Sequence, residues 1–304
     1  MLVRRVVLMA AVVAAATILD STAPSGRLVA QQARPGGDVV PRDLRPEDLF
    51  QGRPWTGAQG VTETVAQIME RQRQTPPQPR RLREEFEYHP DKQPNPESLE
   101  VSRWPLEDSR IETSMPGPPL LPQTIGTNFT GVHAGESTAV PPDSVGAVGP
   151  TQVLVLANGR FRNYDKIGTP LSLNVTDSVF FSLVRNGGGV SDPHVRYDRL
   201  SGRWFITEIN IPACQCSNRI MIAVSSGPVI NNETSFTFYE FQHDAVGTTP
   251  NSDTGGFADY DTLGIDANAL YMGINEFNPT NGTFIGTTGY VVNKANLLVG
   301  TLTV

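Results

Sequence analysis

Three aspartates lead three similar stretches of the chain, and their spacing is the pattern in this sequence that could support chemistry. Asp143, Asp192 and Asp259 stand 49 and 67 residues apart, and each begins a unit that passes through a turn into an apolar run. Carboxylates that a repeated fold brings together either bind calcium or serve as the acid and base of a glycosidase. A turn-capping role explains the same residues without a reaction, because Asp commonly accepts backbone N–H bonds beside Gly and Pro.

Other polar residues extend these positions into two candidate sets. His194 follows the second aspartate by two positions, so the predicted ligand-binding set is Asp143, Asp192, His194 and Asp259. The loop "NSDTGGFADYDTLGIDAN" supplies hard oxygen ligands without EF-hand spacing, and the predicted calcium set is Asp259, Asp261 and Asp266. No catalytic residue can be named, because no His occurs with Ser or Cys in a nucleophile motif.

Cys214 and Cys216, in "PACQCSN", are the two cysteines of the chain. Export would permit a disulfide, but a bridge between residues separated by one other requires a strained ring. The pair is therefore a strained local disulfide, two thiols or half of a metal site. Zinc is the least favoured of the three, because no His lies nearby and no second Cys pair exists.

The elements that must position these residues are short strands in residues 125–304. Runs such as "TQVLVLAN", "RWFITEIN", "NRIMIAVS" and "ALYMGIN" have strand length, and several alternate with period two. Asp, Asn and Gly between them suit the tight turns of antiparallel strands. The pattern predicts an antiparallel, all-β domain.

The repeated units predict how these strands are arranged. "PPDSVGAVG", "NGRFRNYDKIG", "DPHVRYDRLSGRWF" and "DYDTLGID" resemble, in this order, the motifs of exported bacterial β-propeller proteins of uncharacterised function that are loosely sialidase-like. The resemblance implies a β-propeller, whereas the sialidase Asp-box itself is not met. A closed propeller needs four or more blades and about three units fit, so we expect an incomplete or truncated propeller. A β-sandwich is the alternative fold.

Two segments precede the predicted domain. Residues 1–30 have the layout of a secretory signal peptide, with "MLVRR" before the apolar run "VVLMAAVVAAATIL"; an uncleaved anchor is the alternative. Residues 31–124 hold 15 of the 25 prolines and 27 of the 55 charged residues, which predicts a disordered linker. A short helix is expected at 61–74, with Thr62 or Thr64 as its cap.

Charge and export limit the function. The net charge is −7 and residues 125–304 hold no basic cluster, which argues against nucleic-acid binding. Export predicts a secreted, periplasmic or cell-surface protein with no membrane span after signal removal. We expect a module that binds an extracellular glycan or protein ligand, with calcium support. The alternatives are a glycoside hydrolase of sialidase-like architecture and a structural envelope component, and the lack of a named acid and base favours a protein that is not an enzyme.

Overall fold

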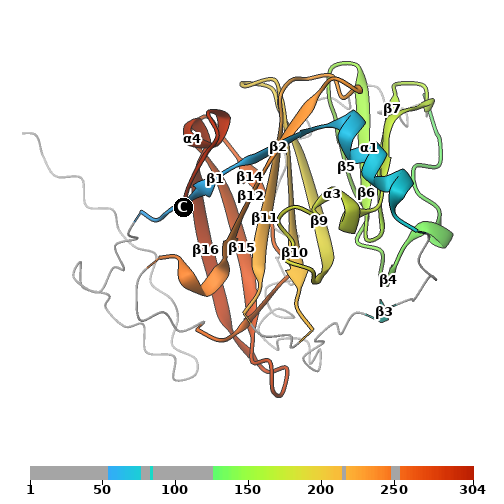
Figure 1. The fold of residues 1–304 in the computed structure, drawn as a ribbon. Coiled ribbons are helices and arrows are strands. Elements are labelled where there is room, and N and C mark those ends of the chain that lie inside the picture. Colours follow the sequence, from blue (N-terminus) through green and yellow to red (C-terminus); the bar gives the residue numbers. More distant parts are fainter. Residues whose placement is uncertain (1–53, 77–82, 85–125, 214–216, 248–253) are drawn as a thin grey trace, which may run out of the picture. The chain divides into compact units, whose positions relative to one another are not determined.

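The structure is a computed structural model that describes residues 54–76, 83–84, 126–213, 217–247 and 254–304 (Figure 1). These residues all belong to one compact unit, Phe50–Val304. The predicted signal peptide, the rest of the predicted linker and the two cysteines, Cys214 and Cys216, lie outside the described residues.

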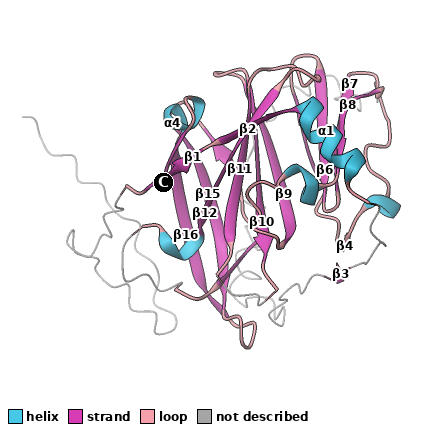
Figure 2. Ribbon diagram, in the orientation of Figure 1, coloured by secondary structure: helices cyan, strands magenta, loops and turns pink. Residues whose placement is uncertain are grey.

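Strands make up nearly half of the described residues, with short helices between them (Figure 2). The strands are β1 (Thr56–Gln59), β2 (Val61–Thr64), β3 (Arg83–Glu84), β4 (Ala139–Val140), β5 (Val145–Val148), β6 (Gln152–Ala157), β7 (Arg160–Asp165), β8 (Pro170–Val175), β9 (Gly189–Asp198), β10 (Arg203–Ile211), β11 (Arg219–Ser225), β12 (Ser235–Gln242), β13 (Phe257–Asp259), β14 (Gly264–Ile265), β15 (Ala269–Phe277), β16 (Phe284–Asn293) and β17 (Thr301–Thr303). The helices are α1 (Val65–Gln74), η2 (Ala134–Glu136), α3 (Asp177–Phe180), η3 (His243–Ala245) and α4 (Lys294–Leu298).

Three antiparallel sheets follow one another along the chain. The first sheet has the order β5-β6-β7-β8, the second has the order β2-β12-β11-β10-β9, and the third joins β13, β14 and β16 to β15. Two small pairs complete the description, β1 with β17 and β3 with β4. None of the sheets in the described residues is closed. The all-β prediction is confirmed.

The second sheet is buried on both faces, and β10 shows why. Its sequence "RWFITEINI" is nearly continuous in large side chains, so both sides of the pleat carry apolar groups. Trp204 and Ile206 enter a core shared with the first sheet, whereas Phe205 and Ile209 enter a second core shared with the third sheet. Two packed cores therefore hold the three sheets together.

Residues 54–76, which we call the strap, are ordered although the sequence places them in the disordered linker. β1 pairs with β17, β2 pairs with β12, and α1 contacts β8 and α3 (Figure 1). The expected helix begins at Val65 because residues 61–64 pair as a strand, and Thr64 caps it in a reciprocal pair of bonds with Gln67. Val65 and Ile68 are fully buried in the first core, so distant strands supply the apolar environment that the linker composition lacks.

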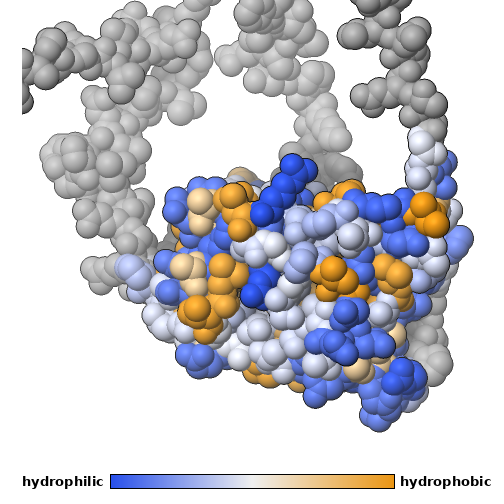
Figure 3. All heavy atoms as spheres, turned by 90° about the horizontal axis from the view of Figure 1, so that it is seen from above, coloured by the Kyte–Doolittle hydropathy of each residue, from blue (hydrophilic) through white to orange (hydrophobic). Residues whose placement is uncertain are grey.

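The surface carries no large apolar feature on the face drawn in Figure 3. Hydrophobic side chains on that face lie in small separate groups among hydrophilic ones. No helix among the described residues has the length and apolar character needed to cross a membrane.

Candidate ligand-binding site

Of the four non-glycine residues with left-handed backbone, three lie in or next to the leading strands of the three sheets, and one, Asn186, precedes β9. Asp143 has φ 42°, Asp192 has φ 62° and Tyr260 has φ 57°. Asp143 precedes β5, Asp192 lies in β9, and Tyr260 lies between β13 and β14. A non-glycine residue in this conformation costs about 1–3 kcal/mol and occurs preferentially at functional sites. The third left-handed residue is one position after the predicted Asp259.

Asn158 joins the first two predicted aspartates. Its Nδ2 donates to Asp143 Oδ2 at 2.8 Å, and its Oδ1 accepts from the backbone N–H of Asp192 at 2.9 Å. The amide is fully buried and thus fixed at the boundary between the first and second sheets. The sequence places Asn158 at the end of its strand, but nothing local indicates that it bridges two aspartates.

His194 connects this group to the third sheet. Its ring meets the ring of Tyr260 edge-on, with centroids 5.6 Å apart and planes at 86°. Burial and the charge of Arg196 lower the pKa of His194, and a hydrogen bond with the backbone of Asp261 opposes them only in part. The imidazole is therefore neutral at neutral pH. Tyr260 itself is 49% exposed, so its ring is available to a ligand.

Asp261 follows Tyr260 in the sequence and is fully buried. Thr207 Oγ1 donates to Asp261 Oδ2 at 2.5 Å, whereas Oδ1 has no hydrogen-bond partner among the described residues. Burial, with a smaller effect from the charge of Asp259, raises the pKa of Asp261 to about 7, although hydrogen bonds from Thr207 and from the Asp261 backbone lower it. This carboxyl ties the second sheet to the third and is not accessible to a ligand.

The predicted calcium set is not gathered at one point. Among the described residues no group of three or more His, Cys, Asp or Glu side chains could hold a metal ion. Asp266 instead caps a turn, where Oδ1 accepts from the backbone N–H groups of Asn268 and Ala269 at 2.7 and 2.9 Å. Asp259 Oδ1 likewise accepts from the backbone N–H of Tyr260 at 3.1 Å. These contacts match the turn-capping interpretation of the aspartates.

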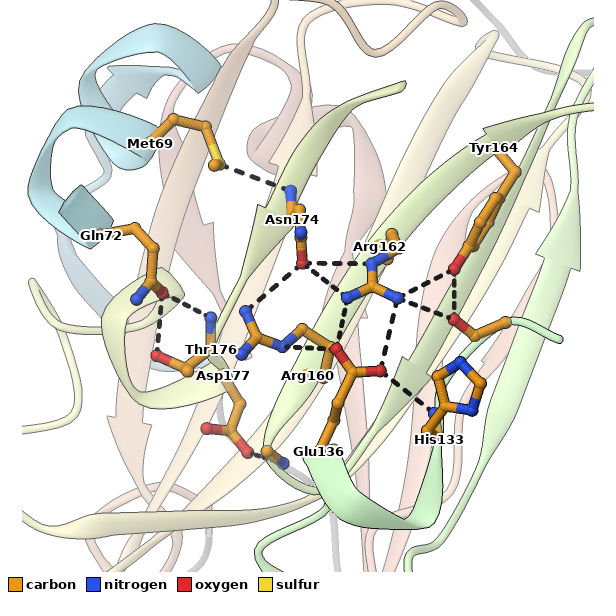
Figure 4. Close-up of polar contacts among 12 residues, drawn as sticks. Met69, Gln72, His133, Glu136, Arg160, Arg162, Tyr164, Asn174, Thr176 and Asp177 are labelled. Atoms are coloured by element: carbon orange, nitrogen blue, oxygen red, sulfur yellow. Dashed lines mark hydrogen bonds and ion pairs between the residues drawn. The ribbon is translucent and has the colours of Figure 1, made fainter. Parts of the chain in front are cut away.

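A second polar cluster, absent from the sequence predictions, covers the outer side of the first sheet (Figure 4). Arg162 Nη2 donates to Glu136 Oε1 at 2.5 Å and to Asn174 Oδ1 at 3.0 Å, and Arg160 Nε lies 3.8 Å from Glu136. Burial opposes ionisation of Glu136, but its bonds with Arg162 and the His133 backbone lower its pKa overall. The cluster sets two guanidinium groups against one carboxylate, and it holds residues 131–136 against β7. Its members come from distant segments of the chain, so no local sequence motif predicts the cluster.

Comparison with known proteins identifies no relative of this chain: no family model, no curated protein and no solved structure matches it. The resemblance to exported propellers therefore stays a prediction. The functional case depends on the row of polar residues from Asp143 through Asn158, Asp192 and His194 to Tyr260.

Proposed function

We propose that this chain is an exported module that binds an extracellular glycan, and that its three sheets are blades of an incomplete β-propeller. The blade interpretation is supported by three antiparallel sheets in chain order whose leading strands are neighbours, β5 with β9 and β9 with β14. In a propeller such leading strands line the central channel, and residues at one of their ends form the binding surface.

The observation that carries the proposal is the conformation of Tyr260. Tyr260 is about half exposed, and its backbone at φ 57° is strained, whereas glycine would adopt this conformation without strain. The ring packs against buried His194, which fixes its orientation before any ligand arrives. An exposed, oriented aromatic face is suited to stacking against the apolar face of a sugar ring.

Two carboxylates complete the expected sugar site. Asp143 and Asp259 are partly exposed. Asp143 accepts a hydrogen bond from Asn158 Nδ2, and Asp259 accepts one from the Tyr260 N–H. Ionised carboxylates accept hydrogen bonds from hydroxyl groups, which is how sugars present themselves. Tyr260 would therefore supply stacking, and the two aspartates would supply orientation.

A hydrolase is the second candidate, and Asp261 is the residue that would favour it. A carboxyl group with a pKa of about 7 is suited to act as a general acid near neutral pH. Complete burial and the Thr207 bond keep this group away from any substrate. The binding module is therefore the better supported proposal.

Substitution of Tyr260 by glycine tests the proposal because it should move stability and binding in opposite directions. Tyr260→Gly removes the ring and relieves the left-handed strain. We therefore expect glycan binding to be lost and the free energy of unfolding to rise by about 1 kcal/mol. A glycan array and urea denaturation measure the two effects. Tyr271→Gly is the matched control: Tyr271 is 42% exposed on β15, and its loss should preserve binding while lowering stability.

Unchanged glycan binding by Tyr260→Gly would refute the site. Turnover of chromogenic glycosides by the wild-type chain, abolished by Asp261→Asn, would instead support the hydrolase. Binding of a protein ligand without glycan binding would keep the module but change its ligand class.

A further inference from the structure

β7 carries two arginines side by side on the outer face of the first sheet. In its sequence "RFRNYD" Phe161 is fully buried in the first core, so Arg160 and Arg162, one position to either side, lie on the opposite face. Alternate residues of a strand are about 7 Å apart, which sets two positive charges close together. Among the described residues, Glu136 is the carboxylate that forms ion pairs with both (Figure 4).

Arg162 occupies the acceptors of this cluster. Its Nη1 and Nη2 donate to the two carboxylate oxygens of Glu136 at 3.4 and 2.5 Å, and its Nη1 also donates to the Gly131 carbonyl at 3.2 Å. Its Nε and Nη2 donate to Oδ1 of Asn174, the residue directly opposite on β8, at 3.1 and 3.0 Å. Arg162 is therefore a positioning residue that fixes Glu136 and Asn174.

Arg160 is left with few acceptors. Its one hydrogen bond among the described residues runs from Nη1 to Asn174 Oδ1 at 3.3 Å, and that oxygen already accepts from Arg162. Its Nε is buried without a hydrogen-bond partner, because Glu136 Oε1, at 3.8 Å, is beyond hydrogen-bond range. A guanidinium has five N–H donors, and the Arg160 side chain is 22% exposed, so an acceptor from outside the chain can reach it.

Nearby charges do not replace the missing acceptor. Asp177 acts on Arg160 through its charge, but no hydrogen bond joins these two side chains, and Asp177 Oδ2 accepts instead from the Gly159 backbone N–H. Burial lowers the pKa of Arg160 and the charge of Arg162 adds to this effect, although the two nearby carboxylates oppose it. A further negative group beside Arg160 would therefore stabilise its charged form.

We propose that Arg160, held beside Arg162 on the outer face of the first sheet, binds an oxyanion: a carboxylate or a tetrahedral phosphate group of an acidic ligand. Guanidinium donors form a planar fork that matches both kinds of group. The anion supplies the acceptor that Glu136, already bound to Arg162, does not offer to Arg160. This site does not use the ring of Tyr260, so it goes beyond the proposed glycan site and stands without it.

Titration of the full-length chain with sodium phosphate and with sodium acetate tests the site. In a calorimeter at neutral pH and matched ionic strength, at least one of the two anions should bind at one site per chain. Arg160→Gln should weaken that binding about tenfold or more, because it removes charge-assisted hydrogen bonds. The anion that binds more tightly identifies the group, with phosphate standing for a tetrahedral anion and acetate for a carboxylate.

Arg199→Gln is the matched control, since it removes the same charge from an exposed arginine in the turn between β9 and β10, and it should leave anion binding unchanged. Arg160→Gln should keep the thermal midpoint measured without the anion, because Arg160 makes a single long hydrogen bond. If that midpoint falls, Arg160→Lys replaces it: lysine keeps the charge, loses the planar fork and should still weaken binding. Absence of saturable binding of both anions to the wild type, or equal affinities of Arg160→Gln and Arg199→Gln, would overturn the proposal.

Discussion

At the scale of single residues, Asp261 makes stability depend on pH. Burial first, and then the charge of Asp259, raise its pKa from 3.8 to about 7 in the folded chain. Since the folded pKa is above the unfolded one, the contribution of the protonated group is fully present below pH 3.8. It is lost as the pH rises through about 7, where the buried carboxyl ionises.

Asp261→Asn should remove this loss, because an amide keeps the shape and cannot ionise. Above pH 7 we expect the variant to exceed wild type in unfolding free energy by up to roughly 4 kcal/mol, and below pH 4 we expect the two to differ by about 1 kcal/mol or less. Urea denaturation from pH 4 to 8 measures the difference. A constant difference between the variant and wild type across this range would contradict the prediction.

Asp266→Asn is the control of opposite sign. Backbone N–H bonds from Ala269 and Asn268 lower the pKa of Asp266, so its contribution is present near neutral pH and lost on acidification. This variant should be less stable than wild type at neutral pH, and the difference in stability should shrink in acid.

Sequence alone could predict part of the candidate site at this scale. It places Asp192 and His194 together because they are neighbours in one strand, and it marks Asp143 as the start of an equivalent unit. Asn158 and Thr207 were not predicted as connectors, because their partners lie between 15 and 54 residues away in the sequence. Such contacts exist only after the sheets have packed.

At the scale of elements, the strap shows how local composition can mislead. The proline and charge content of residues 31–124 describes that whole stretch, but two apolar residues one helical turn apart are enough to order α1 when other strands provide the core. The turn residues and the alternating runs of the later strands are local signals in the sequence, so the all-β class was predictable. Trp204, in one of these strands, is fully buried and donates from Nε1 to the Pro228 carbonyl at 2.9 Å.

Ile68→Ala measures how strongly the strap is anchored. A fully buried isoleucine in the first core should cost about 2–5 kcal/mol of unfolding free energy when truncated, which denaturant unfolding can resolve. Arg73→Ala, on the exposed side of the same helix, should change stability by about 0.5 kcal/mol or less. Equal effects of the two substitutions would contradict the buried role of α1.

At the scale of the whole molecule, the number and order of the sheets were easier to predict than their closure. Three units in the sequence correspond to three sheets in chain order, because each unit contains its own turns and strands. Whether the sheets form part of a closed ring depends on the outer surfaces of the first and third sheets. The first sheet has its outer side covered by the Glu136, Arg160 and Arg162 cluster, and the third ends in β16, which pairs with β15.

The pairing of β1 with β17 has a mechanical consequence. The backbones of Trp55 and Val304 exchange two hydrogen bonds, of 2.8 and 2.9 Å, at the end of this antiparallel pair. Tension applied between the N-terminal side of Trp55 and Val304 therefore loads these bonds one after another rather than all together. Single-molecule stretching should show an early low-force step for the β1–β17 pair before the sheets yield, and one single high-force step would contradict this. Under tension, the described unit should therefore open first at the β1–β17 pair.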